Sequence, residues 1–395
     1  MVRTNKKLDP SQTGNDAAKL RSSLQKLVVG QEEPIAQIVS IHQTWTAGMT
    51  DPNRPIGSFL FLGPTGTGKT RLVEATAESL LGDPRAVIKI DCGEFQQSHE
   101  IAKLIGSPPG YLGHRETHAA LSQEALDRHH TESTRISFVL FDEIEKASDA
   151  VWNLLLGILD KATLTLGDNR KVDFSQSMIF MTSNIGAADM EAMVRPKLGF
   201  TTGDAEANRA NGVADEALNG KISRAGVEAM RRKFSPEFVN RIDKIAVFKP
   251  LGRSELDSVL TIELHRLQNR ILTSQHAAPF VFSVGDQARE YLLREGTDMK
   301  YGARHLKRAI ERHLVHPLSN LIASSQVDSG DLVRVDYDET SDCLIFVKEA
   351  EEIAGWTMAR MIDRPAEMRA AVGAYADAKW PPRTATAKKE RSRRV

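Results

Sequence analysis

The sequence contains only two cysteines, Cys92 and Cys343, far apart in the chain. They can build neither a disulfide framework nor a zinc site, which favours a reducing compartment. The formal net charge is +0, so no excess charge draws the whole molecule to nucleic acid or to a membrane. No apolar run approaches the roughly 18 residues of a membrane-spanning helix, and the polar N-terminus has no signal-peptide pattern. These absences predict a cytoplasmic protein without a membrane partner.

The 395 residues are enough for two to three globular domains. Short apolar runs at 58–62, 86–90, 136–141 and 177–182 predict strands, and a helix is predicted over 69–81 between the first two. Buried strands separated by helices favour an α/β fold with a parallel sheet flanked by helices. Ligands of such sheets bind at the carboxyl ends of the strands, so the polar residues that close these runs are the candidates for function.

The C-terminal part predicts a smaller, mostly helical domain. Residues 187–226 are rich in small and polar residues and predict an exposed loop. After a boundary at 250–252, Ser254 is the predicted N-cap of a helix with a leucine stripe. A further helix begins near Ala303 and is predicted to kink or end at Pro317. Alternating residues at 332–337 and 343–347 predict a β-hairpin.

A glycine-rich motif, GPTGTGKT, follows the first predicted strand and opens a helix. Its residues are Gly63, Pro64, Thr65, Gly66, Thr67, Gly68, Lys69 and Thr70. Glycines let backbone N–H groups turn toward phosphate oxygens, and the N-terminus of the helix favours the same anion. Lys69 is placed to reach the β- and γ-phosphates of a bound nucleotide, and the hydroxyl of Thr70 to bind Mg²⁺. The alternative is a glycine-rich turn without a ligand.

An acidic pair closes the third predicted strand in SFVLFDEIEK. Asp142 is placed to hold Mg²⁺, and Glu143 to orient or deprotonate the attacking water. An acidic turn in solvent is the alternative interpretation. Together with the phosphate motif, the pair predicts a nucleoside-triphosphate hydrolase, and the two motifs do not say which kind.

Five motifs in order resemble the Clp-type AAA+ unfoldases: LIGSPPGYLGH, DEIEKASDAVWNLLLGILD, MTSNIGA, FSPEFVNRID and YGARHLKRAI. The resemblance runs from about Asp16 to Val347 and is to the second ATPase module of the two-module ClpA, ClpC and ClpB proteins. It implies an AAA+ large ATPase domain at 16–250 and a small C-terminal domain at 251–348. A disordered extension at 1–15 and a C-terminal extension with a basic tail at 349–395 complete the predicted organisation.

The resemblance also implies roles for individual residues. Asn184 matches the polar sensor of the γ-phosphate or the lytic water, with a helix cap as the alternative. Arg241 matches the arginine finger that reaches the ATP of a neighbouring subunit, which implies a homo-oligomeric ring, with six subunits as the family expectation. A surface arginine paired with Asp243 is the alternative. Arg304 matches the second sensor, the alternative being an exposed residue at a helix start.

Three further segments are assigned by the resemblance. Val28 and Val29 match the segment that packs on adenine, or are plain core. Tyr111 and Leu112 match the loop that grips polypeptide substrates, or Tyr111 is a core tyrosine. The tripeptide Leu198, Gly199, Phe200 is similar to the one that docks on the barrel peptidase ClpP. The alternative is that Leu198 and Phe200 pack on their own domain.

The chain departs from the family in several places. We find no N-terminal adaptor domain, no other ATPase module and no coiled-coil insert of the ClpB type. Residues 160–165 are expected in a loop where the family usually has Asp-Gly-Arg. The extension beyond residue 349 has apolar residues for docking or for packing on its own domain, and its basic end is read as a solvated tail rather than a nucleic-acid site. The predicted function is ATP-driven threading of polypeptides, and the alternative is an ATP-gated remodelling factor with one dedicated partner.

Overall fold

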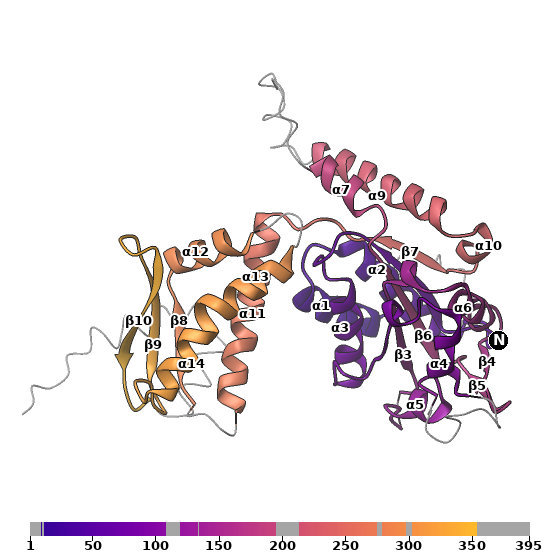
Figure 1. Cartoon of the computed structure of the whole chain (residues 1–395), viewed down its shortest axis with the longest axis horizontal. Helices are drawn as coiled ribbons and strands as arrows, with labels where there is room; N and C mark the ends of the chain where they lie inside the picture. The colour runs from indigo at the N-terminus through magenta and orange to yellow at the C-terminus, as the bar shows by residue number, and fades with distance from the viewer. Residues whose placement is uncertain are drawn as a thin grey trace, which may run out of the picture. The chain divides into compact units, whose positions relative to one another are not determined.

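The structure is a computed structural model that describes residue 9 and residues 12–107, 119–132, 134–194, 213–274, 279–297 and 302–353. The chain divides into two compact units (Figure 1). The first joins residues 1–262 with 292–310, and the second joins 263–291 with 311–395. Helix α11 (Arg253–Thr273) runs across this division, so the domain boundary at residues 250 and 251 stays a prediction. No helix in the described part of the chain is long and apolar enough to cross a membrane.

A five-stranded parallel sheet forms the centre of the first unit. Its strands stand in the order β2 (Ile88–Asp91), β3 (Ser137–Asp142), β6 (Ser177–Ser183), β1 (Gly57–Leu62), β7 (Lys244–Val247). Every residue of β1 and β6 is buried, which explains their continuous apolar runs. The four predicted strands and the α/β fold class are confirmed. Strand β7 has only four residues and begins with a lysine, so no sequence pattern identified it.

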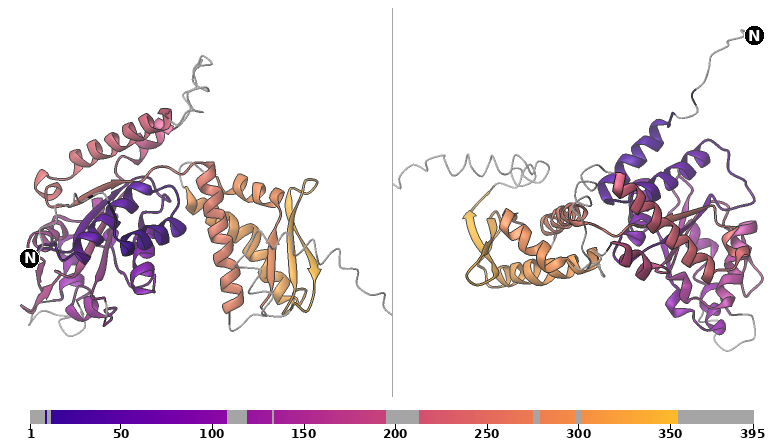
Figure 2. Two further views of the ribbon diagram at one scale, coloured as in Figure 1. Left: turned by 180° about the vertical axis from the view of Figure 1, so that it is seen from behind. Right: turned by 90° about the horizontal axis from the view of Figure 1, so that it is seen from above.

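The two faces of this sheet carry separate hydrophobic cores, because successive side chains of a strand point to opposite faces. Within β1, Leu60 and Leu62 pack into one core, whereas Phe59 and Phe61 pack into the other. Helices α1 (Asn15–Leu27), α2 (Glu32–Thr46) and α3 (Lys69–Leu81) cover the phenylalanine face (Figure 1). Helices α6 (Asp149–Lys161) and α9 (Val213–Lys233) pack into the other core, and α9 also lies beside β7 (Figure 2).

The exposed loop predicted over 187–226 is wrong where the structure describes that stretch. Residues 187–194 form α7 (Ala187–Val194), and α9 begins at Val213. Alanine is the strongest helix former, so the small-residue composition does not exclude a helix. Met190 and Ile222 are buried, and Gly226 lies so close to Met190 that a Cβ there would be 2.3 Å from its Cε. The small residues therefore serve close helix packing.

The loop predicted over 160–165 is also wrong. Asp160 and Lys161 are the last two residues of α6, and β4 (Thr163–Thr165) pairs with β5 (Lys171–Asp173) as an antiparallel hairpin. The middle residue of each strand, Leu164 or Val172, is buried in the core under the sheet between two exposed neighbours, which is the alternation of a strand. The short elements of this unit are η1 (Cys92–Glu94), η2 (Ser98–Ile101), α4 (Ala102–Ile105), α5 (Gln123–Asp127), η3 (Ile144–Lys146) and α10 (Pro236–Val239).

The second sheet has the order β10 (Cys343–Ala350), β9 (Leu332–Asp338), β8 (Val281–Val284). The β9–β10 pair is antiparallel, which confirms the predicted hairpin. The helices of this part of the chain are α11, α12 (Asp286–Gly296), α13 (Ala303–Ile310), the π-helix η4 (Glu311–Val315) and α14 (His316–Ala323). One prediction fails locally, because helix α11 begins at Arg253 and Ser254 lies inside its first turn. The α-helix that begins at Ala303 ends at Ile310 and gives way to η4, and Pro317 lies in the first turn of α14, where a missing N–H is tolerated, so the predicted break of the helix is confirmed.

Candidate nucleotide-binding site

The glycine-rich motif forms the turn between β1 and α3, and its backbone requires the glycines. Gly66 and Gly68 have φ of 78° and 100°, which residues with a Cβ rarely adopt. At Gly63 a Cβ would lie 2.6 Å from the carbonyl oxygen of Phe248, so a side chain has no space there. Gln31, itself buried, donates through Nε2 to the carbonyl of Thr67 at 3.3 Å and so holds the turn from the side of α2.

Lys69, the first residue of α3, points its ammonium back into this turn. Its Nζ donates to the carbonyls of Gly63 and Pro64 at 2.6 and 2.8 Å and to Oδ1 of Asn184 at 2.9 Å. Burial lowers the pKa of Lys69 from its ordinary 10.5 to about 8, although the carboxylate of Asp142 acts in the opposite direction. The lysine is therefore a buried cation at the carboxyl end of the sheet.

The acidic pair at the end of β3 lies against the first turn of α3. The hydroxyl of Thr70 donates to Oδ2 of Asp142 at 3.4 Å, and the hydroxyl of Thr182 donates to Oδ1. Mg²⁺ in phosphate sites takes one or two protein oxygens and completes its shell with water and phosphate. Among the described residues no cluster of three or more His, Cys, Asp or Glu side chains could hold a metal alone. Thr70 and Asp142 together fit a metal shared with a nucleotide.

Glu143 is held in an unusual conformation. Its φ is 54°, a left-handed value that costs free energy in a residue with a Cβ. Its N–H donates to Oγ1 of Thr182 at 3.1 Å, its Oε1 accepts from Nδ2 of Asn184 at 3.3 Å, and its Oε2 pairs with the ammonium of Lys146. These contacts fix the direction of the carboxylate at the strand end.

Asn184, which follows β6, connects the two motifs. Its amide oxygen accepts from Lys69 and its amide nitrogen donates to Glu143, while its backbone N–H donates to Oε1 of Glu145 at 3.1 Å. One side chain thus bridges the lysine of the turn and the carboxylate beyond β3. The amide of Asn184 uses its acceptor on one side and its donor on the other, and its role as a phosphate sensor stays a prediction.

Three residues of the site were not assigned a role from the sequence. Thr182 joins Asp142 to Glu143, Glu145 holds the backbone of Asn184, and Lys146 pairs with Glu143. A signal existed for Thr182, because it closes a buried apolar run at the sheet edge where ligands bind. Glu145 and Lys146 lie in a short 3-10 helix, and a sequence pattern gives no direction to such side chains.

Arg241 lies at the opposite end of the sheet. The parallel register pairs Phe59 with Lys244, so Arg241 precedes the amino end of β7. Its guanidinium pairs with Glu237 at 3.1 Å and Asp160 at 3.8 Å. The alternative pairing with Asp243 is wrong, because the Asp243 carboxylate accepts from the N–H of Ser58 and pairs with Arg54.

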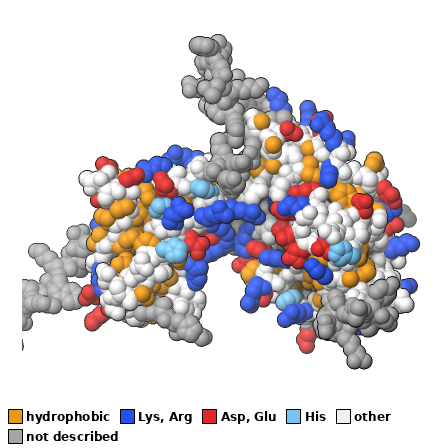
Figure 3. Space-filling view, in the orientation of Figure 1, with side chains coloured by type: hydrophobic (Ala, Val, Ile, Leu, Met, Phe, Trp, Pro, Cys, Tyr) orange, Lys and Arg blue, Asp and Glu red, His pale blue; other side chains and the backbone are white. Residues whose placement is uncertain are grey.

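Arg304, in the first turn of α13, belongs to the first unit and lines a cavity of about 650 Å³ together with Asp142 and Glu143. The N–H of Ala303 donates to the carbonyl of Gly66 at 3.1 Å, which ties the start of α13 to the phosphate turn. Lys89 and Lys103 line the same cavity. Acidic and basic side chains also stand close together on the visible face of this unit (Figure 3).

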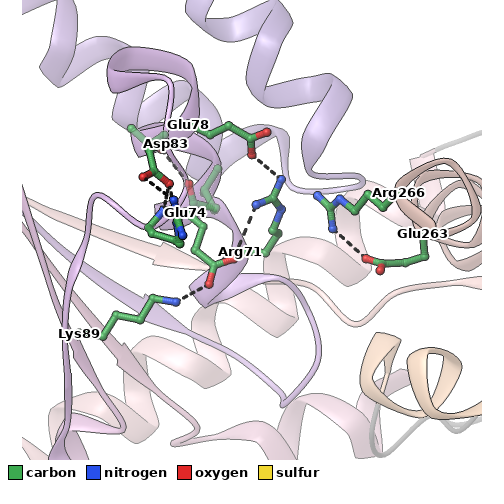
Figure 4. Close-up of polar contacts among 10 residues, drawn as sticks. Arg71, Glu74, Glu78, Asp83, Lys89, Glu263 and Arg266 are labelled. Carbon is green, nitrogen blue, oxygen red and sulfur yellow. Dashed lines mark hydrogen bonds and ion pairs between the residues drawn. The ribbon is translucent and has the colours of Figure 1, made fainter. Parts of the chain in front are cut away.

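An ion-pair network fixes α3 against β2 (Figure 4). Arg71 pairs with Glu78 at 2.8 Å and with Glu74 at 3.6 Å, and Glu74 accepts from Lys89 at 2.5 Å. Because Arg71 follows Thr70 directly, the network holds the first turn of the helix that carries Lys69 and Thr70.

The remaining predicted site residues divide into two groups. Val28 is buried and would lie 3.7 Å from a Cβ at Gly68, while Val29 is half-buried, so contact with adenine stays a prediction beside the core interpretation. Tyr111, Leu112 and the tripeptide at 198–200 lie outside the described residues.

The chain is similar in sequence to known proteins and to two family models. A family model described as "AAA domain (Cdc48 subfamily)" matches residues 54–245, and one described as "C-terminal, D2-small domain, of ClpB protein" matches residues 251–335. Chaperone protein ClpB of Pseudomonas putida is 40% identical over 323 residues, which are 81% of this chain and 34% of that protein. The ATP-dependent Clp protease ATP-binding subunit ClpC of Staphylococcus saprophyticus is 37% identical over 319 residues, which are 81% of this chain and 36% of that protein.

A solved structure agrees with the sequence matches. Hsp104 in a closed state with ATPγS and FITC casein aligns with a TM-score of 0.67 and 27% identity, covering 84% of this chain and 52% of that chain. The chain spans about a third of the length of the curated relatives it matches. From both domain matches and the site geometry, the chain belongs to the Clp-type AAA+ ATPases and corresponds to their second ATPase module.

Proposed function

We propose that the chain binds ATP with Mg²⁺ at the carboxyl end of the parallel sheet and hydrolyses it. The observation that carries this is the bridge made by Asn184 between Lys69 and Glu143. Lys69 and the backbone of the turn would hold the phosphates, and Thr70 with Asp142 would hold the metal, which supplies positive charge to the transferring phosphoryl group. Glu143 would orient and deprotonate the attacking water.

Arg241 would complete the site of a neighbouring subunit in a homo-oligomeric ring, with a hexamer as the proposed size. The distance between Arg241 and the phosphate turn of its own chain supports this proposal. Strand β1 has six residues at about 3.3 Å each, so roughly 20 Å separate its amino end, near Arg241, from the phosphate turn at its carboxyl end. An arginine side chain does not bridge that span, whereas a closed ring brings one subunit's surface to the next.

The work done with ATP would be the unfolding and threading of polypeptides, gripped by Tyr111 and Leu112. The relatives named as chaperones and the Hsp104 structure with casein support this function. The relative named as a subunit of the Clp protease supports docking of Leu198, Gly199 and Phe200 on a ClpP-like peptidase, and the cytoplasm would be the site of action. A remodelling factor that acts on a single dedicated partner is the alternative function.

The test uses Glu143→Gln as a variant that binds ATP without turnover. The variant is expressed in its native host, isolated with ATP, and its bound proteins are identified by mass spectrometry. Many unrelated polypeptides would support threading, and a co-purified barrel peptidase would support docking. One partner at fixed stoichiometry would replace threading by the remodelling function. As a second readout, Tyr111→Ala should stop a threading enzyme and spare a remodelling factor.

A further inference from the structure

The turn of the β4–β5 hairpin touches the chain just before residue 108. The N–H of Gly167 donates to the carbonyl of Ile105 at 2.9 Å. A Cβ at Gly167 would lie 2.4 Å from the carbonyl oxygen of Gly106 and 3.1 Å from the carbonyl carbon of Ser107. Both obstacles are backbone atoms, which cannot move aside as the end of a flexible side chain can. Glycine is therefore required at position 167 by space.

The chain on the two sides of residues 108–118 is joined directly. The N–H groups of Ala120 and Leu121 donate to the carbonyls of Lys103 and Leu104, each at 3.1 Å. Leu104 and Leu121 are both buried in the core beneath the sheet. We call residues 102–107 the first stem and residues 119–121 the second stem of this segment. Both stems are anchored to the core of the first unit.

The hairpin also holds the helix that follows the second stem. The N–H of Asp173, in β5, donates to Oε1 of Gln123 at 2.9 Å, and Arg170 pairs with Glu124 at 3.6 Å. Arg170 is itself held by Asp168 at 2.7 Å. The ion pairs are exposed and contribute little each. The closest fit of the hairpin to the stems is therefore at Gly167.

Regular structure connects this contact to the nucleotide site. Directly after Glu143 come η3 and α6, and α6 passes into β4 through Ala162. The N–H of Ser148 donates to the carbonyl of Phe95 at 2.9 Å, and that of Phe174 donates to the carbonyl of Ala162 at 2.7 Å, so both ends of α6 are tied. No long irregular segment separates Glu143 from the hairpin.

We propose that the β4–β5 hairpin is the structural support of both stems and that Gly167 is its positioning residue. The support fixes the positions of Ser107 and Ala119, the described residues on either side of the segment 108–118. The consequence for substrates rests on the proposed function, because that segment carries Tyr111 and Leu112, the predicted grip. A side chain at position 167 would displace the stems while leaving Lys69, Asp142, Glu143 and Asn184 in place.

The test compares Gly167→Ala with Gly157→Ala in the full chain. Gly157 is exposed in α6 and a Cβ there meets nothing within 4 Å, so it controls for the change of residue type. Hydrogen exchange is measured on peptides that contain Ala120 and Leu121. We expect at least tenfold faster exchange in Gly167→Ala only, with ATP hydrolysis within threefold of the parent. Unfolding of fluorescein-labelled casein should fall at least tenfold.

The outcomes separate the support from the proposed function. If Gly167→Ala behaves as Gly157→Ala in both exchange and casein unfolding, the proposal is overturned. If the stems exchange faster but the parent chain never acts on casein, the support stands and threading fails. Should Gly167→Ala not fold, Gln123→Ala removes the hydrogen bond that its Oε1 accepts from the N–H of Asp173, without adding volume. It should raise exchange at Ala120 and Leu121 about threefold, and unchanged exchange there would overturn the proposal as well.

Discussion

The two sheets of the molecule differ in how they meet solvent. All seven residues of β6 are buried, as expected of a parallel sheet covered on both faces. In β10, at the edge of the second sheet, Ile345 and Val347 are 40% and 37% exposed, and the facing strand residues Asp336 and Arg334 pair with each other. Polar residues on an open face need no further explanation. At the ends of β3 and β6 the polar side chains are buried or half-buried, and there they hydrogen-bond to one another and to the residues of the phosphate turn.

The two cysteines give the largest expected difference between the two sheets. Cys92 is buried at the end of β2, whereas Cys343 is exposed in β10. Burial, and after it the charge of Asp142, raises the pKa of the Cys92 thiol, which keeps it protonated and unreactive. With a chromogenic disulfide reagent, we expect Cys343 to react on the order of a thousandfold faster, since exposing Cys92 requires opening a core worth several kcal/mol. Similar rates for both thiols would contradict the burial of Cys92 after β2.

A core substitution tests the covered sheet itself. Phe180 stacks on Phe59 with ring centroids 4.9 Å apart and contacts Phe61 and Phe138. Phe180→Ala should lower the free energy of unfolding of the first unit by about 3–5 kcal/mol. The matched change Ile345→Ala in the open sheet should cost within about 0.5 kcal/mol. The loss for Phe180→Ala is measured by urea titration with Cys92 reactivity as the signal, and the loss for Ile345→Ala by urea titration with a spectroscopic signal. Equal losses of unfolding free energy would contradict the difference between the covered and the open sheet.

Thr182→Val tests whether the polar strand end serves catalysis. The change keeps the shape but removes the hydroxyl that joins Asp142 to Glu143. We expect kcat for ATP to fall about 10- to 100-fold through misplacement of the carboxylates, with nucleotide affinity within threefold. Thr340→Val, in the turn of the second sheet, is the matched control and should leave kcat unchanged. A fall in affinity as large as the fall in kcat would argue for a general structural role.

The buried lysine gives the smallest effect, a pH dependence. Lys69 has a pKa lowered to about 8, so its ammonium is charged below pH 8 and loses its charge as the pH rises above it. A bound phosphate favours the charged form, so ATP affinity should fall by up to about tenfold per pH unit above 8. Titration with a fluorescent nucleotide from pH 7 to 9.5 measures this. Lys69→Arg stays charged, and its affinity should show no such fall.

Much of the first unit could be predicted, because its strands are continuous apolar runs and its phosphate turn has fixed glycine positions. Lys69, Asp142, Glu143 and Asn184 come together as their places at strand ends predict. The hairpin after α6 escaped prediction because its strands have three residues each, too few for periodicity. The helices α7 and α9 escaped because a composition of small residues is shared by loops and by closely packed helices.

Some contacts cannot be predicted in principle from local pattern. Gln31 reaches Thr67 and also the backbone of Lys249, more than 200 positions later in the chain, by hydrogen bonds of 3.0 and 3.1 Å to Lys249. For Arg241 the sequence suggested Asp243 as a partner, yet the guanidinium pairs with Glu237 four residues earlier and with the distant Asp160. Such pairings depend on which strand ends the topology brings together.

We propose that ATP is hydrolysed at the carboxyl end of the parallel sheet, with Glu143 as the base. Phosphate release by Glu143→Gln, measured beside its affinity for a fluorescent ATP analogue, tests this role. We expect affinity within threefold of the parent chain and a turnover lower by about 10²–10⁴-fold, the contribution typical of general base catalysis. Turnover equal to that of the parent chain would contradict it.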